Sequence, residues 1–221
     1  MIRIILASAS PRRRQLLSEI IPRFEIIVEE IDESLSRDVH PRDGVRILAE
    51  CKGQAVLKSG KISKVGNIIQ NNAIKSDKVY NEFLKQSEKC AESGEYMIIS
   101  SDTLVEIDGI PLGKPENEYD ALKMLMTLSG NEHRVHTGIA VYYKGKTYSD
   151  TASSSVFFKA FDEKTAWDYI KTGEPMDKAG AYAIQGIGVG LVDRYEGDFD
   201  TIVGLSLNLT EKLILEALQN D

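Results

Sequence analysis

Residues 2–17, IRIILASASPRRRQLL, combine a buried strand with the start of a helix. The apolar, β-branched run at 2–6 favours a buried strand. The Ser-Pro pair at 10–11 is typical of the first residues of a helix. Three arginines follow at 12–14, although the positive end of the helix dipole disfavours cations there. Bare amides and arginines at one helix start predict a polyanion site, with phosphate the simplest ligand. The plainer alternative is a solvated basic helix start.

The composition is that of a soluble globular protein with an acidic balance. The 221 residues are 42% hydrophobic and 28% charged, and the formal net charge is -7. Proteins that bind nucleic acid usually show a basic surface, so we expect no nucleic-acid partner. A phosphate site is therefore expected to be a local basic pocket on an acidic protein.

The cysteines and the apolar runs bear on the cellular compartment. Cys51 and Cys90 form no CxxC pair, so no zinc or redox motif is visible and reduced thiols are expected. No basic-then-apolar signal pattern occurs at the N-terminus. No apolar run approaches the roughly 18 residues that a membrane span needs. We therefore expect a cytoplasmic location and no membrane partner.

Strand and helix patterns interleave along the chain, which predicts an α/β fold. Strands are predicted at 2–7, 24–29, 96–101, 103–107, 135–144, 149–158 and near 189–195. Helices are predicted at 11–20, 42–58, 117–128, 163–171 and 203–219. Alternating strands on either side of Lys144 and Gly145 predict a hairpin, so the sheet is expected to be mixed.

The segment 59–95 differs from the rest of the chain. It is rich in Lys, Asn, Ser and Gln and contains few large apolar residues. We interpret it as an insertion between a helix and a central strand, and as a solvated excursion. A lid or a partner surface is the sharper alternative.

The segment 99–115, ISSDTLVEIDGIPLGKP, places an acid and a lysine on one predicted hairpin. Asp102 follows an apolar strand, and we expect it at a strand end, where open α/β sheets bind ligands. A carboxylate there can hold a divalent cation or activate water. Asp108 and Gly109 predict a tight turn, and Lys114 follows it. A surface hairpin with ordinary charges is the alternative.

The segment 174–190, EPMDKAGAYAIQGIGVG, is dense in small residues around Lys178 and Gln185. Such a loop lets the backbone approach a ligand closely. The amide of Gln185 both donates and accepts, which suits recognition of a base edge. The glycines do not show GxGxxG spacing, so they are not interpreted as a dinucleotide fingerprint. GxxxxGK[ST] and GxSxG motifs are also absent.

The histidines and the tryptophan give weaker signals. His133 and His136 lie three apart on a predicted strand, so we expect them on opposite faces rather than on one metal. His40 is expected at the surface. Trp167 is expected to pack within its helix surface rather than to stack on a ligand.

Taken together, the motifs resemble the Maf family of nucleoside triphosphate pyrophosphatases. The matching pieces are LASASPRRRQLL, LAECKGQAV, SDTLVEIDGIPLGKP, MLMTLSGNEHRVHTGIAV, EPMDKAGAYAIQG and DFDTIVGLSL. The resemblance implies a fold like that of inosine triphosphate pyrophosphatases, with an elongated mixed sheet, flanking helices and a central cleft. It implies one catalytic domain over 1–221, in two lobes with the insertion at about 59–95, and a homodimer. It also implies hydrolysis of a nucleoside triphosphate to the monophosphate and pyrophosphate with Mg²⁺ or Mn²⁺.

The resemblance also implies roles for individual residues. The catalytic set is Asp102, Glu33 and Lys114, and the two carboxylates are also the expected metal ligands. The expected substrate-binding residues are Ser8, Arg12, Arg13, Lys52, Thr103, Lys178 and Gln185. Three features depart from the family pattern: the insertion, serines at 100–101 in place of small residues, and Ser206 in place of a common proline.

The form IQG around Gln185 is similar to the branch of the family that acts on dTTP and UTP. A related branch that acts on 7-methyl-GTP carries an acidic residue there. Two alternatives remain open. One is a nucleotide-binding regulator of cell division and septum formation without significant catalysis, and the other is an enzyme for modified pyrimidine nucleotides. The complete set of acidic and basic residues favours an enzyme.

Overall fold

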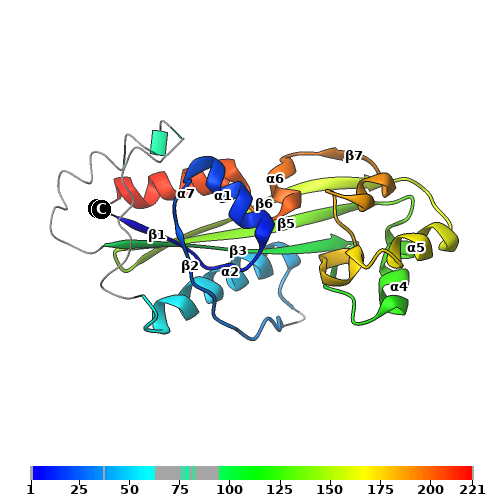
Figure 1. The fold of residues 1–221 in the computed structure, drawn as a ribbon, viewed down its shortest axis with the longest axis horizontal. Coiled ribbons are helices and arrows are strands. Elements are labelled where there is room, and N and C mark those ends of the chain that lie inside the picture. Colours follow the sequence, from blue (N-terminus) through cyan, green and yellow to red (C-terminus); the bar gives the residue numbers. More distant parts are fainter. Residues whose placement is uncertain are drawn as a thin grey trace.

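The computed structural model describes residues 2–36, 38–62, 76, 78–79, 82 and 95–220. Within these ranges a seven-stranded sheet extends along the molecule in the order β2-β1-β3-β5-β6-β7, with β4 pairing on β3 (Figure 1). Most of the insertion predicted at about 59–95 lies outside the described residues.

The elements follow the predicted interleaving of strands and helices. The strands are β1 (Arg3–Leu6), β2 (Glu25–Ile26), β3 (Tyr96–Ile107), β4 (Ile110–Leu112), β5 (Glu132–Tyr143), β6 (Lys146–Phe158) and β7 (Val192–Glu196). The α-helices are α1 (Pro11–Ile20), α2 (Pro41–Lys58), α4 (Glu118–Leu128), α5 (Glu163–Ile170), α6 (Phe199–Val203) and α7 (Leu207–Gln219). Short 3₁₀ helices are η2 (Glu174–Asp177), η3 (Ala179–Ala181) and η4 (Ile187–Leu191). β1 is parallel to β2 and β3, and the other described pairs are antiparallel. The predicted α/β class with a mixed sheet is confirmed.

Helices cover both faces of the sheet. α2 lies on one face, and α1, α6 and α7 lie on the other, while α4 and α5 pack together at one end (Figure 1). Alternation along the strands supplies both cores. Ile5 and Ile98 belong to the cluster that includes Ala49 and Val56 of α2. Their neighbours in sequence belong to the larger cluster with the side chains of α1 and α7.

The predicted start of the first helix is confirmed. Ser10 is the N-cap of α1, and its hydroxyl accepts a hydrogen bond of 3.4 Å from the amide of Arg13. Pro11 occupies the first helical position, where no amide donor is needed. The arginines at 12–14 therefore do lie in the first turn of a helix.

Both predicted tight turns are confirmed. Asp108 and Gly109 join β3 to β4 with φ of 51° and 78°, and Lys144 and Gly145 join β5 to β6 with φ of 47° and 75°. Two consecutive left-handed residues are the geometry of a two-residue hairpin turn that matches strand twist.

The predicted strand end at Asp102 is wrong, because β3 continues through it. Antiparallel pairing with β5 runs without a break from Met97 to Glu106 and holds Asp102 opposite Gly138. The parallel pairing of β3 with β1 ends earlier, at Ile99. Asp102 therefore lies in mid-strand but beyond the carboxyl end of β1, next to the segment that leads into α1.

The helix predicted at 203–219 begins later, at Leu207 in α7, and the separate short helix α6, which was not predicted, precedes it. α6 ends at Val203, and Gly204 follows with φ of 126°, which an L side chain rarely adopts. Ser206 then caps α7 by accepting a hydrogen bond of 3.3 Å from the amide of Leu209. The serine that replaces the common family proline thus supplies a cap. The strand predicted at 24–29 is reduced to the two residues of β2.

Substituting the cap should measurably destabilise α7. We expect Ser206→Ala to lower the free energy of unfolding by about 1 kcal/mol, the usual cost of losing a serine N-cap. Urea unfolding followed by circular dichroism measures this loss. Ser36→Ala, at an exposed serine, serves as the control. Equal midpoints for both variants would contradict the capping role.

Candidate active site

Three residues that the sequence singles out meet at one point. The ammonium group of Lys52, on α2, lies 2.7 Å from a carboxylate oxygen of Glu33 and also contacts the carboxylate of Asp102. Glu33 comes from the segment before α2, and Asp102 from β3. The lysine and Asp102 side chains are only 17% and 11% exposed, so this double ion pair is partly shielded from water.

Two glycines bring α2 close enough to the sheet for this contact. A Cβ atom on Gly53, next to Lys52, would lie 2.4 Å from the ring of Tyr142. A Cβ atom on Gly138, opposite Asp102, would lie 2.3 Å from the backbone of Val45 in α2. At Gly138 backbone therefore packs on backbone, and at Gly53 the helix backbone packs on the side chains of Tyr142 and Ser100. These close contacts fix the spacing between α2 and the sheet.

Further positive charge lies close to the two carboxylates. The hydrogen bond from Lys52 lowers the pKa of Glu33, burial opposes this effect, and the charges of Lys114 and Arg13 also lower it. The structure thus brings Lys114, an exposed residue beyond the β3–β4 hairpin, within electrostatic range of Glu33. Glu33 is held in its charged form at neutral pH.

Arg13 is enclosed by hydrogen bonds to three parts of the chain. Its Nε donates to the carbonyl of Gly204 at 2.9 Å. Its Nη1 donates to the carbonyl of Ser101 at 2.8 Å and to the hydroxyl of Ser8 at 3.5 Å. Its Nη2 donates to the hydroxyl of Thr103 at 3.0 Å. Four of the five N–H donors of this guanidinium are used within the protein.

The two clusters lie on opposite faces of β3. Successive side chains of a strand alternate, so Asp102 faces α2 while Ser101 and Thr103 face α1 and Gly204. Burial lowers the pKa of Arg13, and the charge of Asp102 opposes that effect. The predicted set thus divides into Glu33, Lys52 and Asp102 on the side of α2, and Ser8, Arg13 and Thr103 on the other.

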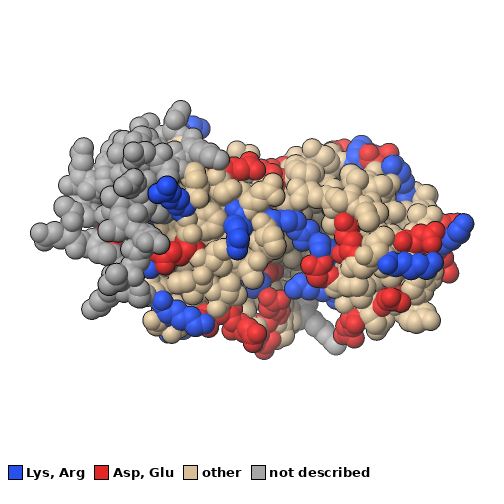
Figure 2. Space-filling model, viewed as in Figure 1, with Lys and Arg blue, Asp and Glu red and all other residues tan. Residues whose placement is uncertain are grey.

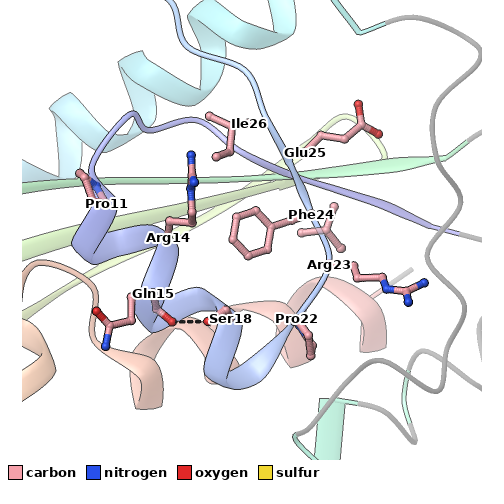
Figure 3. Close-up of a pocket in the computed structure, with 10 residues that line it drawn as sticks. Pro11, Arg14, Gln15, Ser18, Pro22, Arg23, Phe24, Glu25 and Ile26 are labelled. Carbon is pink, nitrogen blue, oxygen red and sulfur yellow. Dashed lines mark hydrogen bonds between the residues drawn. The ribbon is translucent and has the colours of Figure 1, made fainter.

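The three arginines of α1 have different surroundings. Arg12 is half-buried and makes no hydrogen bond or ion pair with any residue that the structure describes, while its charge acts on Tyr169 and Asp177. Arg14 lines a cavity between α1 and β2, beside Phe24 (Figure 3). Arg12 therefore differs from Arg13 in having side-chain donors that no described residue uses.

The loop with small residues contributes separate groups. Lys178 pairs with Asp177, and its ammonium is largely shielded, with 16% of the side chain exposed. Gln185 is exposed. Neither Lys178 nor Gln185 makes a hydrogen bond or ion pair with Glu33, Lys52 or Asp102 in the described part of the chain. Arg12 connects the regions, because its charge acts on both Arg13 and Asp177.

Sequence reasoning selected Ser8 and Thr103 but missed Gly204, which also holds Arg13 in place. The carbonyl of Gly204 accepts hydrogen bonds from Arg13 and from the hydroxyl of Ser101, at 2.9 Å each. A glycine after an apolar run is a signal for a helix end, and it could have moved the predicted start of the last helix beyond Gly204. Nothing in the local pattern indicates that its carbonyl faces an arginine 191 residues away.

The donor set fits a hard divalent cation. Two carboxylates converge on one point, and Mg²⁺ is usually held by one or two carboxylates together with substrate phosphates and waters. No group of three His, Cys, Asp or Glu side chains that could hold a metal occurs within the described ranges. A cation here would therefore need oxygen ligands from the substrate or from water.

The face of the molecule shown in Figure 2 has no large patch of positive charge among the described residues. Lys and Arg there are interspersed with Asp and Glu, as expected from the acidic composition. Among the helices of the described ranges, none has the length and apolar character of a membrane span.

The two histidines of β5 lie in different environments. His133 hydrogen-bonds to the hydroxyl of Tyr182 at 2.7 Å, and His136 bonds to Glu106 at 2.9 Å and to Ser153 at 2.7 Å. They share no partner among the described residues, as expected for side chains that face opposite sides of a strand. His40 is exposed as predicted, although its Nδ1 also caps α2.

His133 should make stability depend on pH. Burial lowers its pKa to about 4, whereas the unfolded chain has the ordinary value of 6.5. The unfolded state therefore binds the proton first, so this contribution is complete above pH 6.5 and is lost as pH falls towards 4. Between pH 7 and pH 5 we expect the wild type to lose about 2 kcal/mol more than His133→Phe. Urea titrations at both pH values test this, and equal losses would contradict it.

Comparison with known proteins adds a consistent finding. A family model described as Maf-like protein matches residues 3–217. A Bdellovibrio bacteriovorus protein named dTTP/UTP pyrophosphatase is 34% identical over 213 residues, which cover 96% of each chain. A Thermococcus kodakarensis protein of the same name is 37% identical, covering 95% of this chain and 94% of the relative. One from a Geobacillus species, also of that name, is 38% identical over 94% of each chain.

Proposed function

The chain belongs to the Maf family, and from that premise we propose that it hydrolyses dTTP and UTP to the monophosphate and pyrophosphate. The observation that carries this proposal is the contact of Lys52 with both Glu33 and Asp102, beside Lys114 and the first turn of α1. Acids and bases that converge in this way suit a polyanionic substrate and an attacking water. The names of the similar proteins support the reaction and the choice of nucleotide.

Glu33 and Asp102 are the residues that would hold a divalent cation. Such an ion, when bound, lowers the pKa of a water molecule and neutralises charge on the triphosphate. The family resemblance supports Mg²⁺ or Mn²⁺. Lys52 keeps the two carboxylates together and limits their mutual repulsion.

Asp102 orients the attacking water and accepts its proton. Attack is in line at the α-phosphorus, and pyrophosphate leaves. Arg12, Lys52 and Lys114 stabilise the negative charge on the phosphates, the dominant contribution in this class of reaction. Ser8, Arg13 and Thr103 support the phosphate-binding turn from behind, since most donors of Arg13 are already bound to the protein.

Gln185 reads the O4 and N3 edge of thymine or uracil, with Lys178 as a second polar group. A base that lacks the matching atoms leaves polar groups of the site unpaired, which is how such a site rejects it. Modified pyrimidines that keep this edge should be accepted. We also propose a cytoplasmic homodimer, on the strength of the family resemblance.

The proposal is tested by measuring pyrophosphate release from dTTP, UTP, CTP and 7-methyl-GTP with Mg²⁺ and with Mn²⁺. Release from dTTP and UTP, with little from the other two, is the expected result. Activity mainly on CTP or 7-methyl-GTP would keep the reaction but overturn the role of Gln185. No release from any nucleotide, with binding retained, would favour the nucleotide-binding regulator.

A further inference from the structure

Glu174 binds the part of the loop that follows Gln185 in the sequence. Its Oε1 accepts a hydrogen bond of 3.1 Å from the amide of Ile187, and its Oε2 accepts one of 2.9 Å from the amide of Gly188. Oε2 also accepts a hydrogen bond of 2.8 Å from the hydroxyl of Tyr169. One carboxylate thus connects η2, the end of α5 and the residues just after Gln185.

Tyr169 binds the part of the same loop that precedes Gln185 in the sequence. Its side chain is buried in the last turn of α5, and its hydroxyl oxygen accepts a hydrogen bond of 3.1 Å from the amide of Ala183. The hydroxyl therefore donates to Glu174 and accepts from Ala183. Backbone amides two residues before and two residues after Gln185 are fixed to a pair of side chains outside the loop.

The glycines of the loop make room for this pair. Gly186 has φ of 95°, and a Cβ atom there would lie 2.1 Å from Oε1 of Glu174. A Cβ atom on Gly188 would lie 2.5 Å from the hydroxyl of Tyr169. These glycines are not a dinucleotide fingerprint. They are the positions where the two side chains approach the backbone too closely for any side chain.

The charges around the pair favour this arrangement. Burial alone would raise the pKa of Glu174, but the hydrogen bonds from Tyr169, Gly188 and Ile187 lower it, so the carboxylate is charged at neutral pH. Hydrogen bonds to a charged acceptor are stronger than those between neutral groups. The side chain of Gln185 is exposed on an irregular loop, and binding would otherwise have to order that loop.

We propose that Tyr169 and Glu174 are positioning residues that hold residues 183–188 in one shape and thereby present Gln185 to the base of the nucleotide. This inference rests on the proposed function, because it assigns the base edge to Gln185. It goes beyond that function by assigning base selectivity in part to two side chains that need not touch the nucleotide.

The kinetic test uses Glu174→Ala, Tyr169→Phe and the conservative Glu174→Gln. For the first two we expect KM for dTTP and UTP to rise roughly tenfold, as for the loss of a charged hydrogen bond, with kcat within about threefold. The preference for UTP over CTP should fall by a similar factor. Glu174→Gln keeps one acceptor oxygen and should restore part of the loss. The matched controls are Glu163→Ala and Tyr119→Phe, at exposed residues in the first turns of α5 and α4.

Amide hydrogen exchange without nucleotide tests the loop itself. The amides of Ile187 and Gly188 should exchange roughly tenfold faster in Glu174→Ala, and that of Ala183 should do so in Tyr169→Phe. Unchanged exchange would overturn the proposal, and so would faster exchange with unchanged KM and selectivity. Because exchange needs no substrate, it decides the state of the loop even if the wild type hydrolyses none of the nucleotides.

Discussion

Asp102→Asn should lower kcat by about a thousandfold, within the range that a positioned general base contributes. Asparagine has nearly the same shape and can still accept a hydrogen bond from Lys52, so the local structure should persist. What it loses is the negative charge that accepts a proton and holds a cation. Steady-state pyrophosphate release measures the loss, and calorimetric titration with a non-hydrolysable dTTP analogue should show that binding is retained.

The matched control for this experiment is Asp108→Asn, in the exposed turn of the adjoining hairpin. Asp108 has φ of 51°, a conformation that asparagine tolerates, so that variant should keep full activity. Unchanged turnover in Asp102→Asn would remove Asp102 from the reaction. Loss of nucleotide binding in parallel with activity would instead make it a binding residue.

Arg13→Met should be the most destabilising substitution of the charged residues at this site. The guanidinium is enclosed, and its removal leaves the carbonyls of Ser101 and Gly204 and the hydroxyl of Thr103 with lost partners. Breaking a buried charged network of this kind costs about 3–5 kcal/mol. For a chain of this length that corresponds to a fall in Tm of about 10 °C.

Arg14→Met is the control, because the next arginine lines a surface cavity on another side of α1 (Figure 3). Its effect on the free energy of unfolding should stay below about 0.5 kcal/mol, as for other surface substitutions. Both variants are measured by urea unfolding at pH 7. A loss below about 1 kcal/mol for Arg13→Met would show that its hydrogen bonds do not carry this stability.

The start of α1 could be predicted because all its signals are local. Ser10, Pro11 and the preceding apolar strand lie within one short stretch, and each has a known positional preference. The separate helix α6 and the later start of α7 were missed, although Gly204 gave a local signal for them. The mid-strand position of Asp102 was missed for another reason. Whether a strand continues depends on its partner, and β5 pairs with β3 well beyond the end of β1.

The sequence selected residues for the candidate site but did not assign each of them to a face of the sheet, for a related reason. Chemistry and the family resemblance selected Glu33, Lys52 and Asp102, and the fold brings them into contact. The same reasoning named Arg13 and Thr103 as substrate-binding residues, and strand alternation places them on the face of β3 opposite Asp102. The partners of Arg13 include carbonyl groups, and a sequence motif carries no information about which carbonyl is used.

The glycine contacts between α2 and the sheet limit how far the helix can move from the sheet without separating the residues of the site. Lys52 lies on α2, and the backbone of that helix contacts β5 at Gly138, the residue opposite Asp102. The spacing between α2 and the sheet at this glycine therefore limits how closely Lys52 can approach Asp102. A methyl group at position 138 would clash with the backbone of Val45 and push α2 away from the sheet. The ammonium group of Lys52 would move with the helix, although it does not contact position 138. The glycines at these positions therefore help to set the distance between Lys52 and the carboxylate of Asp102.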